Sequence, residues 1–223
     1  MEESMKQMIL ACSSLTEFIE AAQEKMNTAH PVWYLDKKYH MSPKMMRKKV
    51  IAALEEIPEE YDTILVAMGY CGDSWEKIDT ARRIVVPRID DCISLLMTLD
   101  DEYHVNRKTP GHIYVKEENP REISIKNIYE HYTAKMEKET ALQIMESWKR
   151  TYEGIDIIDT GLYDCYDESY LAEVKKDADW LEAEVKYVPG GTHLIEKLVS
   201  GRWDEQFAII EPGEAVGREN YFG

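Results

Sequence analysis

The sequence predicts an α/β protein built on a mainly parallel, Rossmann-like sheet. Short apolar runs typical of buried strands recur along the chain, and the stretches between them show the apolar spacing of amphipathic helices. Strands that alternate with helices pair in parallel through right-handed crossovers. We therefore expect a sheet that is covered by helices on both faces.

The first half of the chain contains the clearest elements. Apolar runs predict strands at 8–11, 31–35, 63–67 and 84–86. Helices are expected after Ser14 and at 43–57, 73–83 and 89–97. Pro43 directly after Ser42 suits a helix start, because serine caps the free N–H groups and proline fits the first turn. The run 63–67 is uniformly apolar, which indicates a strand in the middle of the sheet.

The second half shows the same alternation after an irregular middle. Strands are expected at 112–115, 154–159, 185–188 and 207–210, and helices at 168–181 and 194–199. The segment 123–152 has a helical pattern with a break near 136–139, and the tail from residue 211 is expected to be irregular. We expect a first βα lobe at 1–120, and a helical linker with a second βα lobe at 121–223. A cleft at the carboxyl ends of the strands would lie between two such lobes, and packing as one domain is the alternative.

The net charge and the length of the apolar runs limit the kinds of partner and location that we expect for this protein. Asp and Glu number 43 against 27 Lys and Arg, for a formal charge of -16, which disfavours nucleic acid and anionic membrane surfaces. The apolar runs fall far below the ~20 residues of a membrane helix, and the first residues lack the features of a secretory signal. We expect a cytoplasmic protein whose four cysteines are free thiols or metal ligands.

Three cysteines occupy equivalent places in the predicted sheet. Cys12 follows the first strand, Cys71 lies between two glycines after the third, and Cys92 begins the helix after the fourth. The carboxyl ends of parallel strands form the edge where such folds bind ligands. Since neighbouring strands are ~4.8 Å apart, these thiols can reach one metal ion or iron–sulfur cluster. The sequence thus predicts a metal site made of Cys12, Cys71 and Cys92.

Other residues are candidates for a fourth ligand of this site, and two alternatives to a metal site remain. His40, in a loop expected at the same edge, and Cys165, after a later strand, are the candidates for a fourth ligand. Each cysteine alone also suits the packing of a small apolar side chain, and the chain contains no CxxC pair. A third alternative is nucleophilic catalysis by Cys71 with a histidine base.

Several short motifs occur in order along nearly the whole chain. They are Ile9-Leu10-Ala11-Cys12, Tyr34-Leu35-Asp36 with His40 and Pro43, Gly69-Tyr70-Cys71-Gly72, Pro87-Arg88-Ile89-Asp90-Asp91-Cys92, Thr109-Pro110-Gly111, Asp159-Thr160-Gly161-Leu162 and Ser200-Gly201-Arg202-Trp203-Asp204. With these motifs the chain resembles the family called domain of unknown function sixteen thirty-eight. That resemblance brings no established reaction. It implies an association with corrinoid-dependent methyl transfer from methylamines in anaerobic archaea and bacteria.

The expected function combines the cysteine site with this resemblance. We expect a protein of anaerobic one-carbon or methylamine metabolism that binds zinc or an iron–sulfur cluster through Cys12, Cys71 and Cys92. The resemblance implies a corrinoid or methyltransferase protein as a partner. A corrinoid held by this chain itself is less expected, because the Asp-x-His-x-x-Gly pattern of corrinoid carriers is missing. A non-catalytic accessory protein of a corrinoid methyltransferase system and a cysteine-nucleophile enzyme stay open as alternatives.

Overall fold

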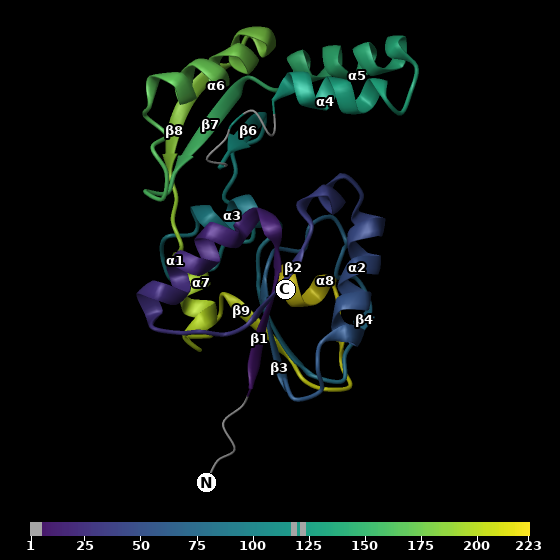
Figure 1. Ribbon diagram of the computed structural model, residues 1–223, viewed down its shortest axis with the longest axis vertical. Helices are drawn as coiled ribbons and strands as arrows, with labels where there is room; N and C mark the ends of the chain where they lie inside the picture. The colour runs from purple at the N-terminus through teal and green to yellow at the C-terminus, as the bar shows by residue number, and fades with distance from the viewer. Residues whose placement is uncertain (1–5, 117–119, 121–123) are drawn as a thin grey trace. The chain divides into compact units, whose positions relative to one another are not determined.

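The chain forms two compact units in the computed structural model, which describes residues 6–116, 120 and 124–223. Unit 1 comprises the described residues up to Arg107 together with Gly191–Gly223, and unit 2 comprises those of Lys108–Gly190. Each unit has its own sheet and its own apolar core. The elements of both are labelled in Figure 1.

Unit 1 contains a mainly parallel sheet of five strands in the order β2-β1-β3-β5-β9. Its strands are β1 (Gln7–Cys12), β2 (Val32–Leu35), β3 (Thr63–Ala67), β5 (Arg83–Pro87) and β9 (Phe207–Ile210). The first four run parallel, whereas β9 pairs antiparallel with β5. The expected α/β class and mainly parallel sheet are confirmed. The central strands are apolar because they are buried in the middle of the sheet.

Helices cover both faces of this sheet. The first face carries α1 (Thr16–Met26), α3 (Cys92–Met97) and α7 (His193–Val199), and the second carries α2 (Pro43–Glu56) and α8 (Arg218–Phe222). Alternate strand residues supply the two cores: Leu65 packs toward the first face, Ile64 and Val66 toward the second. Because β3 is buried on both sides, all of its residues after Thr63 are apolar.

Two expectations about local structure in unit 1 are wrong. The segment 73–83 is not a helix: it consists of turns and the short strand β4 (Ile78–Asp79), because Asp73 and Lys77 have φ angles of 69° and 52°. The tail is not irregular either. It contains β10 (Ala215–Val216), which pairs antiparallel with β4, and then helix α8. Each short strand thus satisfies the other's backbone hydrogen bonds.

The boundaries of the units also differ from the expected division at residue 120. Residues 191–223, expected in a second lobe, belong to unit 1, because β9 pairs with β5 and α7 packs against α1. Residues 117–119 and 121–123, at the expected boundary, lie outside the described part of the chain.

Unit 2 is a three-stranded parallel sheet with helices packed on its apolar face. Strands β6 (His112–Val115), β7 (Gly154–Asp159) and β8 (Glu184–Pro189) lie in this order. Helices α4 (Ile125–Thr133), α5 (Lys138–Thr151) and α6 (Glu168–Leu181) share one core with Val115, Ile155 and Ile157. The predicted helix break is confirmed by the gap between α4 and α5; residue 123, the expected start, lies outside the described residues.

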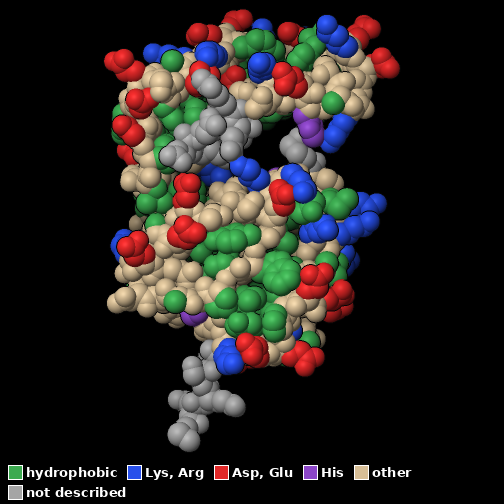
Figure 2. All heavy atoms as spheres, viewed as in Figure 1, with side chains coloured by type: hydrophobic (Ala, Val, Ile, Leu, Met, Phe, Trp, Pro, Cys, Tyr) green, Lys and Arg blue, Asp and Glu red, His purple; other side chains and the backbone are tan. Residues whose placement is uncertain are grey.

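The surface carries both signs of charge. In the view of Figure 2, acidic side chains are scattered over the visible face, while basic ones gather over α2, which contains Lys44, Arg47, Lys48 and Lys49. Among the described residues, no helix is long and apolar enough to cross a bilayer.

Candidate functional site

The carboxyl edge of the five-stranded sheet holds the predicted site residues. Cys12 is the last residue of β1, Cys71 follows β3, and Cys92 is the first residue of α3, after β5. His40 lies in the short 3-10 helix η2 (Lys37–Met41), which follows β2. Because these strands are neighbours in the sheet, the four side chains come from loops that are neighbours along this edge.

Cys12 and His40 form a direct pair. The Cys12 Sγ lies 2.9 Å from His40 Nε2 and 3.2 Å from the Ser14 hydroxyl, and the Ser14 N–H points to the same sulfur at 3.5 Å. Burial alone would raise the pKa of this thiol, but hydrogen bonds and charge from His40, together with Ser14, lower it below its ordinary value. Cys12 is fully buried, whereas His40 is exposed.

The loop that carries Cys71 is fixed against the loop after β5. The Cys71 N–H donates to the Asp90 carbonyl at 2.8 Å, and the Tyr70 N–H donates to the Ile89 carbonyl at 3.1 Å. A Cβ at Gly69 would lie 2.5 Å from the Asp91 Cα, so only glycine permits this approach. Cys71 itself has a left-handed φ of 48°, which is costly for a side chain of this kind and typical of functional loops.

Cys71 is electrostatically coupled to the other two cysteines. Burial raises the pKa of its thiol well above the ordinary value, and the negative charges of Cys92, Asp91 and Cys12 raise it further. These influences place the Cys71 thiol within range of the charges of Cys12 and Cys92. A proton or a cation bound among them would therefore be stabilised.

The two acidic residues beside Cys92 are occupied locally. Asp91 caps α3: its carboxylate accepts from the Ile93 N–H at 2.9 Å and the Ser94 N–H at 3.2 Å. Asp90 accepts from the Asp91 N–H at 2.9 Å and from the Ser94 hydroxyl at 2.6 Å. Their visible role is to start α3 and so to orient Cys92.

Cys165, expected as a possible fourth ligand, belongs to unit 2. It is fully buried, and burial together with the charge of Asp159 raises the pKa of its thiol. Its carbonyl accepts from the Tyr187 hydroxyl at 3.2 Å. Cys165 packs in the apolar core of unit 2.

The donor set at the edge fits a soft or borderline metal by its chemistry, because three thiols and an imidazole are the ligands that zinc and iron–sulfur clusters prefer. It is not preassembled: within the described ranges, no three or more His, Cys, Asp or Glu side chains stand in a metal-holding arrangement. Cys12 and His40 hold each other through a hydrogen bond instead. Binding of a metal therefore requires these side chains to turn away from each other.

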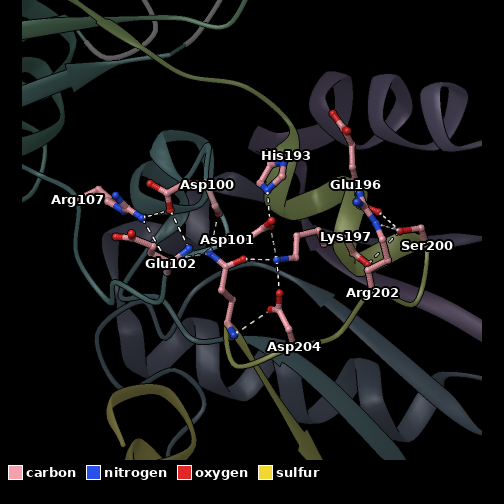
Figure 3. A network of polar contacts seen from close by, with 11 residues as sticks. Asp100, Asp101, Glu102, Arg107, His193, Glu196, Lys197, Ser200, Arg202 and Asp204 are labelled. Atoms are coloured by element: carbon pink, nitrogen blue, oxygen red, sulfur yellow. Dashed lines mark hydrogen bonds and ion pairs between the residues drawn. The ribbon is translucent and has the colours of Figure 1, made fainter.

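A buried lysine that the sequence reading missed lies elsewhere in unit 1. Lys197 of α7 is 3% exposed, and its Nζ donates to Asp101 at 2.7 Å, to Gln206 at 2.6 Å and to Asp204. Figure 3 shows the Asp101 carboxylate between Lys197 and His193, which lies 3.1 Å from it. Each ammonium hydrogen has an acceptor, so the network is structural: it ties α7 to two loops. In the sequence, the signal for this buried network was a lysine within the apolar run of α7.

One of the comparisons with known proteins agrees with the motifs that lie between residues 34 and 199. Neither the search of the curated proteins nor that of the solved structures gave a match. A family model described as "Protein of unknown function (DUF1638)" matches residues 34–199, which include Cys71, Cys92 and His40. Because this match spans most of the 223 residues, the chain belongs to the DUF1638 family.

Proposed function

We propose that the carboxyl edge of the five-stranded sheet binds a zinc ion or an iron–sulfur cluster through the thiolates of Cys12, Cys71 and Cys92. His40 is the nearest candidate for a fourth ligand, since its Nε2 already lies 2.9 Å from the Cys12 sulfur. A bound zinc ion would supply Lewis acidity, and a cluster would supply electron transfer or a site for sulfur chemistry.

One observation carries this proposal: the negative charges of both Cys92 and Cys12 raise the pKa of Cys71. A Cys71 thiolate repelled by the charges of Cys12 and Cys92 is a group that a bound cation would stabilise. The loop geometry supports it further, because the left-handed Cys71 and the close contact of Gly69 with Asp91 hold the β3 and β5 loops together. A strained backbone angle of this kind persists only where the surrounding structure holds it, and such angles cluster at functional sites.

Metal analysis of single cysteine variants tests the proposal. Protein purified without oxygen and reconstituted either with zinc or with iron and sulfide should hold a stoichiometric amount of metal. Cys12→Ser, Cys71→Ser and Cys92→Ser should each lose most of it, because a serine hydroxyl is a far weaker ligand than a thiolate.

Cys165→Ser is the matched control, since it removes a buried thiol from unit 2. It should keep the metal content of the unchanged protein. Metal content that is independent of Cys12, Cys71 and Cys92, or that disappears with Cys165 alone, contradicts the proposed ligand set. Circular dichroism of each variant separates loss of a ligand from loss of the fold.

A second candidate function rests on the Cys12–His40 pair. A thiol with a lowered pKa beside an imidazole is the arrangement of a cysteine nucleophile, in which His40 takes the thiol proton and the sulfur attacks an electrophile. This differs from the sequence-based alternative, which named Cys71: burial and neighbouring negative charges raise the pKa of Cys71, and this disfavours its thiolate.

Titration of the metal-free protein tests the Cys12–His40 pair on which the second candidate rests. Thiolate absorbance should show Cys12 ionising below its ordinary pKa of 9.0 and Cys71 well above it. His40→Asn should shift the Cys12 step to higher pH, because burial is then opposed only by the contacts with Ser14. An enzymatic activity of the protein would separate the two candidates. Loss of this activity in Cys12→Ser and in His40→Asn, with full activity in Cys71→Ser and Cys92→Ser, would favour the nucleophile over the metal site.

We further propose, from the family resemblance, a role in anaerobic one-carbon or methylamine metabolism in the cytoplasm, with a corrinoid or methyltransferase protein as partner. Support comes from the motifs around Cys12, Cys71 and Cys92. Affinity purification from native anaerobic cells tests this: the partner should carry a corrinoid, which its absorption spectrum identifies. Recovery of partners without corrinoid or methyltransferase proteins would contradict it.

A further inference from the structure

Unit 2 contains a cavity between its sheet and its helices. The cavity has a volume of about 240 Å³, and every residue that lines it belongs to unit 2. Most of its wall is apolar or aromatic, with Ile113 and Ile155 on the sheet, Ile128 on α4 and Trp148 on α5. An apolar cavity of about 150 Å³ holds benzene, so this space is large enough for a ring with a short chain.

One carboxylate, that of Asp177 on α6, lies in this wall. Its Oδ2 accepts from the N–H of Ile125, the first residue of α4, at 2.9 Å. Burial raises the pKa of the Asp177 carboxyl above its ordinary value, although this hydrogen bond acts in the opposite direction. The carboxylate has therefore lost part of its hydration without full replacement.

No cationic side chain among the described residues forms an ion pair with Asp177. Lys176 donates instead to Glu173 at 2.6 Å, and its charge has the smallest influence on the Asp177 carboxyl. His112 also lines the cavity, but its Nδ1 lies 2.8 Å from the Asp156 carboxylate, which neutralises the imidazole when it is protonated. Since buried carboxylates are usually paired, one without a cation in an apolar cavity indicates a cationic ligand.

Two aromatic rings make the same wall suitable for a cation. Trp148 and Tyr152 both line the cavity, and their rings meet edge to face with centroids 5.6 Å apart. The faces of such rings attract ammonium groups, and the rings also pack well against apolar groups. The wall therefore suits a molecule that is apolar over most of its surface and carries one positive charge.

A neighbouring cavity of about 310 Å³ is less suitable for a cation. It shares Ile125 and Asp177 with the first cavity, but its wall also includes Lys126 and Lys176. The two ammonium groups repel a cation there. The described wall of the first cavity contains no Lys or Arg, so a cation that approaches Asp177 is favoured on that side.

We propose that the 240 Å³ cavity of unit 2 binds a small organic amine, whose ammonium group pairs with the Asp177 carboxylate. The apolar body of the amine, about the size of a benzene ring with a short chain, fills the space beside Ile128 and Trp148. Charge-assisted hydrogen bonds from the ammonium group replace the hydration that the carboxylate has lost. This site is independent of the cysteine site, which belongs to unit 1.

Calorimetric titration of the full chain with phenethylammonium tests the proposal. Phenethyl alcohol and hydrocinnamate are neutral and anionic probes of nearly the same shape. The ammonium compound should bind at least about 10-fold more tightly than the alcohol, which is the usual gain from a hydrogen bond to a charged group. Hydrocinnamate should not bind, because its carboxylate would be repelled by Asp177.

Three variants assign the binding to this cavity. Asp177→Asn should weaken ammonium binding about 10-fold and change alcohol binding less than about 2-fold, because asparagine still accepts from the Ile125 N–H but carries no charge. Asp179→Asn is the matched control: it removes an exposed carboxylate from the same helix and should change neither affinity. Ile128→Trp fills the cavity and should abolish binding of both compounds.

Equal affinities for the ammonium compound and the alcohol would overturn the inference, as would ammonium binding that Asp177→Asn leaves unchanged. Ammonium binding that survives in folded Ile128→Trp would place the ligand elsewhere, and the absence of binding at millimolar phenethylammonium would exclude the site. Where circular dichroism shows that Ile128→Trp does not fold, the Asp177→Asn comparison decides. None of these measurements involves a metal, so their outcome is separate from that of the proposed function.

Discussion

Removing both carboxylates that neutralise Lys197 is expected to destabilise unit 1 strongly. In Asp101→Ala with Asp204→Ala, the Lys197 ammonium stays in a site where its side chain is only 3% exposed, with Gln206 as its remaining partner. A buried ammonium without a counter-charge costs about 3–5 kcal/mol of unfolding free energy. Urea denaturation followed by tryptophan fluorescence measures this cost as a lower midpoint.

The matched variant Lys197→Met should be milder. It removes the buried charge itself, and the carboxylates that remain are 74% exposed at Asp101 and 43% exposed at Asp204, so water hydrates them. The loss is that of hydrogen bonds from a charged donor, about 1–3 kcal/mol. A Lys197→Met protein less stable than the double aspartate variant would contradict this order.

The same network gives stability a dependence on pH. Burial alone would lower the pKa of Lys197, but its hydrogen bonds to Asp101 and Asp204 raise it above the ordinary 10.5. A group whose folded pKa is raised contributes stability below its unfolded pKa and loses it as the pH rises through the folded value. Unfolding free energy should therefore decline above about pH 10.5, and Lys197→Met should lack this decline.

Gly69→Ala is the second change with a large expected effect. The added Cβ would lie 2.5 Å from the Asp91 Cα and 2.6 Å from the Asp91 nitrogen, and backbone atoms cannot move aside as a side chain does. Overpacking of this kind costs about 3 kcal/mol. It should also separate Cys71 from Cys92, because the two loops meet at this contact. Urea denaturation and metal content after reconstitution measure both effects.

Gly191→Ala is the control for this substitution. Its Cβ would meet only the Leu99 Cδ2, at 3.2 Å, and the end of a leucine side chain can shift. The expected loss is less than about 1 kcal/mol, with metal binding retained. Equal effects of the two substitutions would show that loss of glycine flexibility, rather than the contact with Asp91, is responsible.

Most strands of both units follow from the sequence because each of these is a local apolar pattern, whereas β4 and β10 were not expected. The run 63–67 became β3, and the apolar stretches 154–159 and 207–210 became β7 and β9. The helix predicted at 73–83 was wrong. The apolar spacing of this segment suits a helix, but the backbone angles at Asp73 and Lys77 prevent one. That conformation depends on β4 pairing with β10, more than a hundred residues away along the chain.

The units themselves could not be derived from local pattern. The residues at 207–210 do not indicate that this strand joins the first sheet or that it runs antiparallel there. Sheet pairing is decided by which edge is open when the strand arrives, a property of the assembled sheet and not of either strand.

For the candidate site, the strand pattern alone predicts which thiols lie at the carboxyl edge, because a residue after a parallel strand has only that edge to occupy. Their contacts depend on how the chain packs. Packing pairs Cys12 with His40 and couples Cys71 to Cys92. Hydrogen bonds and charges act through space over a few ångströms, so partners distant in sequence emerge only when the chain has packed.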